Sequence, residues 1–461
     1  MTIHMLDAEQ YFQQGMLSES EDVCRKILSA DPRDAEALHL IGKIASEAGH
    51  YGVATAFIRK AIAADKERAC FHVSLSRAYR FLWRLDAAEQ SCRHALAMDP
   101  TYADAHYELG ATLYQQGHIA EAIDCCGHAI ELKPDHAKAH VKLGTAHLLL
   151  GEWLVGWAEY EWRTRDRRLF QEPRYLSSRP WNGQALNGAR ILIRAEMGLG
   201  DTLQFIRFIP SVAARGGRVV LEVQHELHRL LVHYPATEEV VPRGASIADY
   251  IWHCPLVSLP HVLGTEFSAL PARIPYVKVP SDALRVWSKR LGDSGPRVGL
   301  VWAGDPTQKW DRVRSLRKLS LLAPLGEING LTFFSLQKGI AAEQALDPPA
   351  GLKLIDLSPH LNDFTDTAAA IAHFDLVITT CTSIAHLAGA LGKPVWIMLA
   401  QVADWIWLID REDSPWYPTA RLFRQPTLGA WEPVVKRISG ELRRLAEGDR
   451  SVLHPKTGGI E

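Results

Sequence analysis

The chain has 461 residues, which is too long for one compact core and favours two or three domains. Apolar residues make up 47% of it and charged residues 23%, as in an ordinary globular protein, and the formal net charge is -2. Because proteins that bind nucleic acid usually carry an excess of basic residues, this charge balance disfavours a nucleic-acid partner.

The N-terminal segment Met1–Asp7 has no basic stretch followed by an apolar run, so it does not resemble a signal peptide. No uncharged apolar stretch reaches the length of a membrane span. The seven cysteines are scattered and never spaced as Cys-x-x-Cys, which disfavours a disulfide framework or a zinc site. We therefore expect a cytoplasmic protein without a membrane span.

The first third of the chain contains an internal repeat, because related positions recur every 34 residues, at 31, 65, 99 and 133. Repeats of 34 residues are typical of paired helices that stack, since one unit cannot bury its apolar face alone. Small residues recur at fixed positions, where they allow two helices to approach closely. The recurring columns are Asp31, Asp65, Asp99 and Lys133; Gly42, Ser76, Gly110 and Gly144; Ala54, Ala88 and Ala122; and Gly15, Gly49, Gly117 and Gly151, in which only Trp83 breaks the series.

With this period and these columns, residues 1–151 resemble the tetratricopeptide repeat. The stretches Arg84–Ala88 and His118–Ala122 occupy the positions where the second helix of that family begins. Stacked repeats form a solenoid with an extended concave groove, which the family generally uses to hold proteins or peptides. The resemblance therefore implies a protein or peptide partner on the repeats. A role limited to self-association, or to bracing the second half of the chain, is the alternative.

Residues 152–189 form a junction rich in tryptophan and arginine. Aromatic and basic residues together can indicate nucleic-acid binding. A solenoid, however, needs an atypical terminal unit over its open end. We interpret the tryptophans as a cap and linker to the next domain, and the arginines as a solvated surface. These residues are Trp153, Trp157, Trp162 and Trp181, with Arg163, Arg165, Arg167 and Arg168.

From Arg190 onward, short apolar runs alternate with helical stretches, which predicts βαβ units and parallel sheets. The proline-rich stretch 270–280 divides two such sheets, so we expect two Rossmann-like α/β lobes, residues 190–280 and 281–461. The clearest expected helices are Thr202–Arg215 and Ile384–Leu391. The expected strands are Ile191–Arg194, Val219–Val223, Val298–Trp302, Thr332–Leu336, Leu354–Asp356, Leu376–Thr380 and Val395–Met398.

The loop after the first expected strand is a candidate site, because ligands of open parallel sheets bind beyond the carboxyl ends of the strands. Gly198 and Gly200 permit a tight turn there, and Asp201 follows at the start of a helix. Asp201 is either a helix cap or a catalytic carboxylate. The third glycine of a dinucleotide-binding fingerprint is missing, which disfavours a nicotinamide-dependent oxidoreductase.

A second candidate site follows the strand that ends at Thr380. Thr382 and Ser383 begin a helix whose free N–H groups and dipole attract phosphate. His386, one turn later, either donates to that phosphate or is a buried core residue. The sequence therefore predicts a phosphate-binding helix terminus at this strand end.

Two further strand ends carry polar residues. Lys309, Arg312 and Arg314 follow the third expected strand and could neutralise a diphosphate, although charged runs are more often solvated loops. Gln337 and Lys338 follow the fourth expected strand. These residues extend the candidate site over several strand ends of the second lobe.

Taken in order, the motifs resemble the bacterial tetratricopeptide-linked glycosyltransferases, whose catalytic halves are related to ADP-heptose:lipopolysaccharide heptosyltransferases. The plan of repeats followed by a two-lobed transferase is also similar to O-linked N-acetylglucosamine transferase. The resemblance extends from the first repeat to about Ile438. It is carried by the motifs MGLGDTLQF, VGLVWAG with DRVRS, SLQKG, DFTDTA, TSIAHLAGALGKP, and DSPWYP with LFRQ.

The resemblance implies a GT-B fold, a nucleotide-sugar donor held mainly by the second lobe, and Asp201 as the general base. It implies no resident cofactor and no metal, because GT-B enzymes balance the leaving diphosphate with side chains and a helix N-terminus. The chain also contains no Asp-x-Asp motif, which the metal-dependent type would carry. The donor contacts that the resemblance implies are Lys309, Arg312, Gln337, Lys338, Asp366, Thr382, Ser383 and His386, of which Asp366 is equally well a helix cap.

The chain departs from the family pattern at two positions. Cys381 stands where the family has an aspartate before Thr382, and Ile406 stands where it has an arginine within Asp404–Trp407. The leading hypothesis is a glycosyltransferase whose repeats present a protein acceptor, such as flagellin or another surface protein. The alternative is an interaction scaffold with an inactive transferase half, and self-association of the chain is possible in either case.

Overall fold

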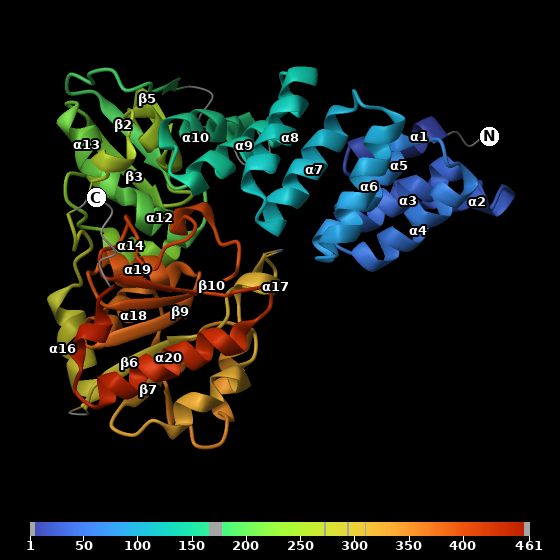
Figure 1. The fold of residues 1–461 in the computed structure, drawn as a ribbon. Coiled ribbons are helices and arrows are strands. Elements are labelled where there is room, and N and C mark those ends of the chain that lie inside the picture. The colour runs from blue at the N-terminus through green and yellow to red at the C-terminus, as the bar shows by residue number, and fades with distance from the viewer. Residues whose placement is uncertain (1–4, 166–177, 272, 293–294, 309, 456–461) are drawn as a thin grey trace. The chain divides into compact units, whose positions relative to one another are not determined.

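The computed structural model describes residues 5–165, 178–271, 273–292, 295–308 and 310–455 (Figure 1). Contacts within the chain divide it into two compact units, Met1–His147 and Leu148–Glu461. The division falls inside helix α9 (Ala137–Leu150).

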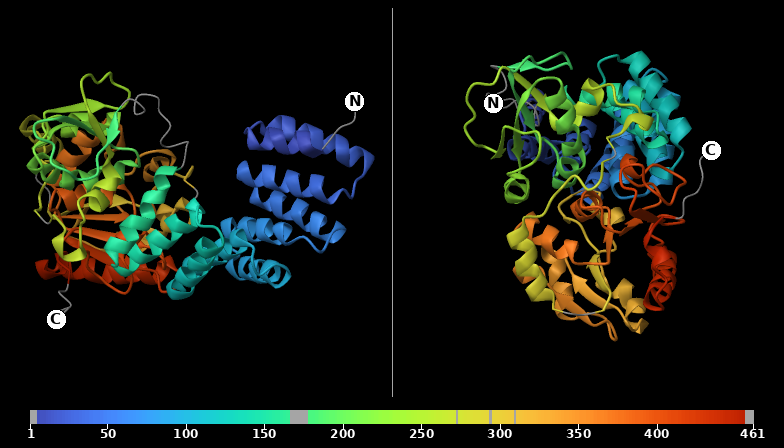
Figure 2. Two further views of the ribbon diagram at one scale, coloured as in Figure 1. Left: turned by 90° about the horizontal axis from the view of Figure 1, so that it is seen from above. Right: turned by 90° about the vertical axis from the view of Figure 1, so that its left-hand side faces the viewer.

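The first unit is a tetratricopeptide-like solenoid of antiparallel helix pairs, as its period predicts (Figure 2). Each first helix packs on the second helix of its own pair, and neighbouring pairs stack on one another. The helices are α1 (Met5–Gln13), α2 (Leu17–Ala30), α3 (Ala35–Glu47), α4 (Tyr51–Ala64), α5 (Ala69–Phe81), α6 (Leu85–Met98), α7 (Ala103–Gln116) and α8 (Ile119–Leu132), followed by α9.

Small residues allow the two helices of each pair to touch. A Cβ atom on Gly42 would lie 2.5 Å from Cγ1 of Ile58, and one on Gly110 would lie 2.8 Å from Sγ of Cys126. The α5–α6 pair has Ser76 at this position, and its hydroxyl accepts a hydrogen bond of 2.8 Å from the thiol of Cys92. The column of small residues in the sequence is therefore a column of close helix contacts.

A second column marks the turn between the helices of each pair. Gly49 and Gly117 adopt the left-handed conformation there, with φ of 80° and 90°. Trp83, which breaks this glycine column in the sequence, takes the same conformation with φ of 60°. Left-handed backbone costs an L-residue roughly 1–2 kcal/mol, so the repeat geometry at Trp83 overrides the local preference.

The second unit contains two fully parallel sheets, in line with the alternation of strands and helices in the sequence (Figure 1). The order of the first sheet is β1-β5-β2-β3-β4, and that of the second is β11-β10-β9-β6-β7-β8. The strands are β1 (Arg179–Pro180), β2 (Arg190–Arg194), β3 (Arg218–Val223), β4 (Glu239–Pro242), β5 (Trp252–Pro255), β6 (Arg297–Val301), β7 (Thr332–Ser335), β8 (Leu354–Asp356), β9 (Leu376–Thr380), β10 (Val395–Leu399) and β11 (Ala420–Arg424).

We call residues 179–269 the first lobe and residues 281–453 the second lobe, each built around one sheet. All seven expected strands are present within a residue or two of their predicted ends. Four strands, β1, β4, β5 and β11, were not predicted from the sequence. The first three are short and end in proline, and β11 has arginine at its second and fifth positions, so none shows a long apolar run.

Helices and short 3-10 turns connect the strands. The single expected helix Thr202–Arg215 is broken, because Pro210 lacks an N–H group and begins a new helix. The helices are α10 (Trp153–Tyr160), α12 (Leu199–Phe205), α13 (Ile209–Ala214), α14 (His225–Leu231), α15 (Leu259–Val262), α16 (Ser281–Leu291), α17 (Asp311–Arg314), α18 (Phe364–Ala372), α19 (Ser383–Ala390) and α20 (Trp431–Ala446). The 3-10 turns are η1 (Glu161–Arg165), η3 (Ile206–Phe208), η4 (Leu256–Ser258), η5 (Phe267–Ala269), η6 (Leu319–Glu327), η7 (Ile340–Leu346), η8 (Ser358–His360), η9 (Trp405–Trp407) and η10 (Arg450–Leu453).

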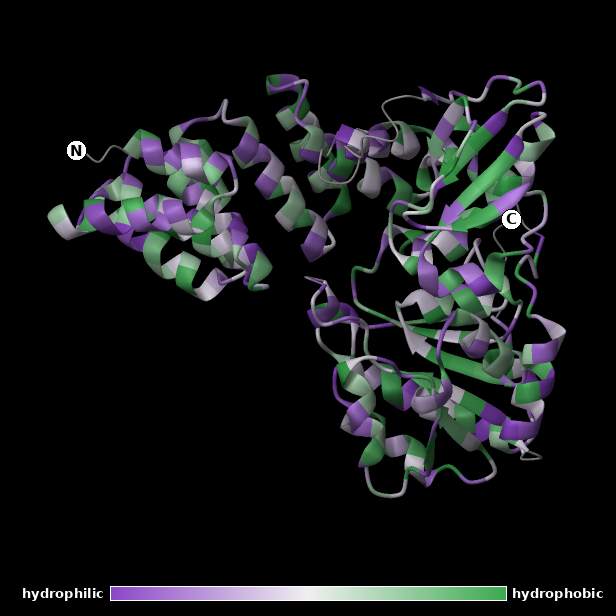
Figure 3. Ribbon diagram, turned by 180° about the vertical axis from the view of Figure 1, so that it is seen from behind, coloured by the Kyte–Doolittle hydropathy of each residue, from purple (hydrophilic) through white to green (hydrophobic). Residues whose placement is uncertain are grey.

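The central strands of the second sheet are buried on both faces, as parallel strands covered by helices must be. Every residue of β9 and of β10 is buried, and both strands are strongly hydrophobic (Figure 3). Trp302 and Trp396 pack with the apolar side of α20 in one buried core cluster. This core fixes the strand ends, and therefore the loops that follow them.

The tryptophans of the junction pack into the second unit. Trp153 stacks on Trp416, with ring centroids 5.0 Å apart, and Trp157 meets Trp405 edge-on at 5.2 Å. The prediction that the neighbouring arginines form a solvated surface is wrong for Arg163, which is buried. Its guanidinium lies 2.5 Å from Glu161 and 3.1 Å from Glu196, so two carboxylates compensate its charge. Arg167 and Arg168 lie outside the described residues.

Across the described ranges, no helix combines the length and the apolar character that a bilayer crossing requires.

Candidate functional site

Both sheets have a topological switch point, the place where ligands of open parallel sheets bind. In the first sheet β2 lies between β3 and β5, and in the second sheet β6 lies between β7 and β9. Successive connections leave these central strands in opposite directions, which opens a crevice beyond their carboxyl ends. The second unit therefore has two candidate crevices, one in each lobe.

A buried ion pair lies at the switch point of the first lobe. The carboxylate of Glu196, two residues beyond β2, accepts hydrogen bonds from the backbone N–H groups of Leu256 (2.9 Å) and Val257 (3.3 Å). It also accepts from Arg163 (3.1 Å), which donates in addition to Oγ of Ser258 (2.8 Å). The Glu196 side chain is completely buried. This ion pair braces the switch point, and a pocket lined by Arg194 and Ser258 lies beside it.

Asp201 ties the turn that begins helix α12. Gly198 is the N-cap of α12, and the Oδ2 atom of Asp201 accepts a hydrogen bond of 3.0 Å from the Gly198 N–H. Burial, followed by the negative charges of Asp404 and Glu196, raises the pKa of Asp201 to about 7, although the Gly198 N–H opposes this shift. The structure thus gives this carboxyl a capping role, and its role as a general base stays a prediction.

Gly200 brings this turn against helix α19 of the second lobe. A Cβ atom on Gly200 would lie 2.8 Å from Cδ2 of His386 and 3.5 Å from Cα of Ser383. A larger residue would force the two helices apart. The structure thus unites two motifs that lie nearly two hundred residues apart in the sequence, the Gly198–Asp201 turn and the N-terminus of α19.

The N-terminus of α19 presents hydroxyl groups. Thr382 is the N-cap, and its Oγ1 accepts a hydrogen bond of 3.3 Å from Ile384 N–H and lies 3.0 Å from Oγ1 of Thr379. Thr382 and Ser383 are both only half-buried. This helix end lies at the switch point of the second sheet, where the dipole and free N–H groups favour an anion.

His386 lies in the contact between the lobes. It is buried, and its Nδ1 atom is 3.0 Å from the hydroxyl of Tyr417. Burial, together with the charge of Arg207, lowers the pKa of His386 to about 3, so the ring is neutral at physiological pH. Its contact with a donor phosphate stays a prediction.

Two of the cations after β6, Arg312 and Arg314, differ in exposure and in their contacts. Arg312 is exposed, whereas the Arg314 side chain is one-third exposed and its Nε lies 3.7 Å from Oδ1 of Asp311. Asp311 is itself fixed by hydrogen bonds from Gly304 N–H (3.1 Å) and the Ser315 hydroxyl (2.5 Å). Arg314 is therefore the cation of this loop that an ion pair anchors, although its Nε atom has no hydrogen-bond partner within the described residues. Lys309 lies outside the described residues.

Cys381, the departure from the family pattern, lies among the charges of the site. The indole N–H of Trp407 donates a hydrogen bond of 3.1 Å to its sulfur. Burial, and then the charge of Asp404, raises the pKa of the thiol to about 12, while Trp407 and Arg314 act in the opposite direction and Asp201 raises it further. The thiol is thus neutral and lies near groups from three other loops.

Arg424, at the end of β11, was not singled out by the sequence analysis. Its guanidinium donates to the carbonyl oxygens of Leu408 (2.7 Å) and Trp407 (3.2 Å). Burial lowers its pKa. It fixes the loop that holds Trp407 against Cys381, and its only sequence signal is its place in the LFRQ motif.

Gln337 joins two strand ends. Its Oε1 accepts from the N–H groups of Trp302 (3.0 Å) and Ala303 (2.9 Å), and its Nε2 donates to the carbonyls of Ala303 (2.9 Å) and Lys338 (2.9 Å). All of its polar groups are engaged within the protein. Lys338 is exposed, and its ammonium donates to the carbonyl of Ser358 (3.0 Å).

Asp366 lies at the start of α18, but Asp363 is the N-cap of that helix. Asp366 accepts hydrogen bonds from Asn362 N–H (3.1 Å) and from the Trp287 indole (3.4 Å), and it lies 3.7 Å from Arg229 of the first lobe. Burial alone would raise its pKa, but these donors and the Arg229 charge outweigh it and lower the pKa. The carboxylate thus braces a helix terminus and a contact between the lobes.

Arg207, which the sequence analysis did not single out, also connects the two lobes. It is buried in η3, and its guanidinium donates to the carbonyl of Trp416 and the hydroxyl of Tyr276, each at 3.0 Å. It lies over the rings of Tyr276 and Tyr417 at 4.7 and 5.1 Å. These contacts hold α12 in place beside α19.

The first unit matches the tetratricopeptide repeat family at residues 35–68 and 103–136. The chain is therefore a tetratricopeptide-repeat-containing protein in which a parallel-sheet α/β unit follows the repeats. Such repeats are typical of proteins that bind other proteins.

Protein FlbA of Caulobacter vibrioides (strain ATCC 19089 / CIP 103742 / CB 15) is 31% identical to the chain over 331 residues, which cover 66% of this chain and 54% of the relative. The chain thus spans about half the length of that relative. Among solved structures, MamA is 24% identical and covers 35% of this chain and 94% of its own, with a TM-score of 0.30. TTC0263, a thermophilic tetratricopeptide protein of Thermus thermophilus, is 21% identical and covers 36% and 92%, with a TM-score of 0.33.

Proposed function

We propose that the α/β unit is a glycosyltransferase, which moves a sugar from a nucleotide-sugar donor to an acceptor hydroxyl. In this proposal the repeats hold the protein that carries the hydroxyl. The main support is the position of Asp201, a carboxyl with a pKa of about 7 on a turn that packs against the N-terminus of α19. A base for the acceptor and a helix end suited to a phosphate are thereby adjacent.

The donor's phosphates would bind at the switch point of the second lobe. The half-buried hydroxyls of Thr382 and Ser383 would accompany the positive end of the α19 dipole, and Arg314 would supply a fixed positive charge. The two separate parallel sheets support the GT-B plan that the motifs imply. The further donor contacts that we propose are Lys309, Arg312, Gln337, Lys338, Asp366 and His386.

The reaction follows from these assignments. The acceptor hydroxyl passes its proton to the carboxylate of Asp201 as its oxygen forms a bond to the anomeric carbon. The bond between that carbon and the phosphate oxygen breaks, and its electron pair leaves with the nucleotide. The developing negative charge on the leaving group is balanced by Arg314 and by the α19 N-terminus.

The proposal is tested by titrating the full chain with UDP-, GDP-, ADP- and CMP-linked sugars. A bound donor raises the melting temperature by mass action, and turnover releases the nucleotide. We expect one donor class to bind and to turn over, and we expect Asp201→Asn to bind that donor without turnover. Asp34→Asn, which changes a capping carboxylate in the repeats, is the matched control and should turn over normally.

A scaffold with an inactive transferase half is the second candidate, and two residues favour it. Cys381 replaces the family's carboxylate with a neutral thiol, and Ile406 is buried where the family has an arginine. Failure of all four donor classes to shift the melting temperature would support the scaffold over the enzyme.

A further inference from the structure

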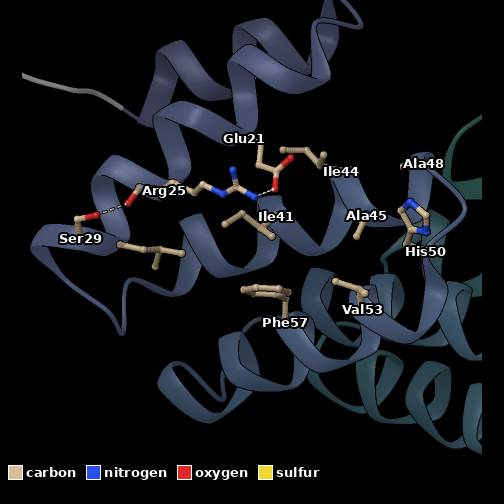
Figure 4. Close-up of a pocket in the computed structure, with 11 residues that line it drawn as sticks. Glu21, Arg25, Ser29, Ile41, Ile44, Ala45, Ala48, His50, Val53 and Phe57 are labelled. Atoms are coloured by element: carbon tan, nitrogen blue, oxygen red, sulfur yellow. Dashed lines mark hydrogen bonds and ion pairs between the residues drawn. The ribbon is translucent and has the colours of Figure 1, made fainter.

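The second helices of the repeats enclose two equivalent grooves. One lies between α2 and α4 over α3 (Figure 4), and the other lies between α4 and α6 over α5. We call them the α2/α4 groove and the α4/α6 groove. Part of the two linings corresponds after a shift of one repeat: Arg25 becomes Arg59, Leu28 becomes Ile62, and Ile41 becomes Leu75.

The α2/α4 groove contains its own counter-ion. Glu21 and Arg25 both line it, and they form an ion pair of 2.7 Å, which Figure 4 shows as a dashed line beside Ile41. The two residues are one helical turn apart on α2, where opposite charges attract. The charge of Arg25 is therefore already compensated within the repeat.

The α4/α6 groove has no ion pair equivalent to Glu21–Arg25. One repeat after Glu21 the chain has Thr55, whose hydroxyl donates to the carbonyl of Gly52 (2.8 Å), so no carboxylate precedes Arg59 by one turn. Arg59, Lys66, His72 and His94 line the groove, and its lining includes no acidic residue. The polar lining of this groove is basic throughout.

Nearby Asp65 does not restore the balance. One of its carboxylate oxygens accepts a hydrogen bond of 3.0 Å from Glu67 N–H, and the other lies 3.9 Å from Arg68. The rings of His72 and His94 stack on each other with centroids 5.0 Å apart, and burial followed by the neighbouring His94 lowers the pKa of His72. The arginine and the lysine among the residues that line this groove are Arg59 and Lys66.

The floor of the α4/α6 groove is apolar. Ile62, Ala63 and Leu75 line it from two helices, and Met98 of α6 is 40% exposed at its edge. Apolar surface beside unpaired cations favours a ligand that carries apolar and acidic groups together, because burial of the apolar part strengthens the attraction of the charges.

On the opposite side of the repeats, the cations are paired with a carboxylate of the protein. The first helices α5 and α7 pack together there, and Glu108 of α7 is completely buried between Arg77 (2.5 Å) and Arg80 (2.9 Å) of α5. Those cations have a carboxylate within the protein. The α4/α6 groove is therefore the stronger candidate for binding an external acid.

We propose that the α4/α6 groove binds an acidic peptide segment with apolar side chains, presented by a partner protein. Its carboxylates would pair with Arg59 and Lys66, and its apolar side chains would cover Ile62, Leu75 and Met98. The inference rests on the part of the proposed function in which the repeats hold a protein. It does not depend on sugar transfer.

The test uses the full chain and two labelled ten-residue peptides, one of alternating leucine and glutamate and one of alternating leucine and lysine. Fluorescence anisotropy should show binding of the glutamate peptide only, and this binding should weaken as salt is added. The double variant Arg59→Glu/Lys66→Glu should weaken it by about tenfold or more, because two attractive charge pairs become repulsive. Arg25→Glu, the equivalent change in the α2/α4 groove, should alter it by less than about twofold.

Equal binding of both peptides, absence of binding, or an equal loss in Arg25→Glu would each overturn the inference. The melting temperature of each variant controls for folding. Donor binding, followed by the melting temperature of the same preparations with the nucleotide sugars, separates this inference from sugar transfer. If the glutamate peptide fails to bind while a donor still binds, only the groove is refuted; peptide binding without binding of any donor refutes only the transferase.

Discussion

The two lobes of the second unit share a sheet topology but use their switch points differently. In the first lobe, Glu196 and Arg163 meet there as a buried ion pair. In the second lobe, the half-buried hydroxyls of Thr382 and Ser383 lie there, at the start of α19. Both sheets therefore provide a switch point, and the loop residues decide which groups line it.

One member of the ion pair in the first lobe comes from outside the sheet. Arg163 belongs to η1, which follows α10, and it reaches both Glu196 and Ser258. A buried charge is costly unless it is paired, so each member of this pair holds the other in place. In the second lobe, the Gly198–Asp201 turn of the opposite lobe packs against the start of α19 instead, and burial raises the pKa of Asp201 to about 7.

The largest effect that we expect is the loss of activity in Asp201→Asn, which would distinguish Asp201 from Glu196. Asp201→Asn keeps the size and one acceptor oxygen of the side chain, so the turn at Gly198 should persist. A general base contributes about 10²–10⁴-fold to a rate, and nucleotide release should fall by this factor. Donor binding, followed by the melting temperature, should be retained. Full activity in Asp201→Asn would refute the assignment of the base.

Glu196→Gln should affect stability rather than chemistry. Removal of one partner from a buried ion pair costs about 3 kcal/mol, because the remaining charge is left partly uncompensated. The cost should appear in the free energy of unfolding from urea denaturation. Glu327→Gln is the control, since Glu327 pairs with Arg443 on the surface and should cost less than about 1 kcal/mol. Equal costs for both variants would show that the first crevice is not braced by this pair.

The pH dependence should separate Asp201 from the other acids of the site. Because its pKa is raised to about 7, the carboxylate is protonated in acid, and kcat/KM should fall about tenfold per pH unit below that value. The folded state also holds this proton more tightly than the unfolded state does. Asp201 therefore lowers stability progressively as the pH rises from about 4 to 7.

Both pH effects should vanish in Asp201→Asn. The pH–rate profile of the wild type and the urea midpoints of both proteins between pH 5 and 8 measure them. If the acid limb of the rate lies near pH 4, Asp201 is not the group that titrates in the reaction.

The repeats and the α/β site differ in how far the sequence predicts them. The repeat period, the small residues at Gly42 and Gly110, and the recurrence of Gly49 and Gly117 were all visible, because each depends on contacts within one helix pair. The left-handed conformation of those two glycines came from the structure. The same locality explains why the seven apolar strands were found. Strands that are short or end in proline, such as β4 and β5, left no such pattern.

The site depends on contacts between distant segments, and there the sequence was less informative. Asp201 and Thr382 could be singled out because they follow strand ends, but nothing local showed that Gly200 brings them together. Arg163 was misjudged because its partner Glu196 is 33 residues away. Arg312 and Arg314 are two residues apart, and only the packing of Asp311 distinguishes the anchored cation from the exposed one.

Arg314→Met tests whether the second crevice holds an anion. The guanidinium would be lost while most of the side-chain volume is kept, and one charge-assisted contact of this kind is worth about 1.5 kcal/mol, or roughly tenfold in affinity. Donor affinity, measured by isothermal calorimetry, should fall by that factor. The exposed Arg312→Met, two residues away, should cost less than about threefold. Equal losses would mean that the anchoring by Asp311 has no functional consequence.

Thr382→Val should give the smallest effect, and it tests the helix terminus itself. Valine keeps the shape of threonine but cannot accept the Ile384 N–H, so α19 loses its N-cap at a cost of about 1 kcal/mol. Thr382→Ser keeps an acceptor oxygen and should restore most of that stability. If the hydroxyl also contacts the donor, valine should weaken donor binding beyond the loss in stability, and serine should recover it. Donor affinities that are identical in Thr382→Val and in the wild type would confine this hydroxyl to capping, and the phosphate would then depend on Ser383, Arg314 and the backbone N–H groups of α19.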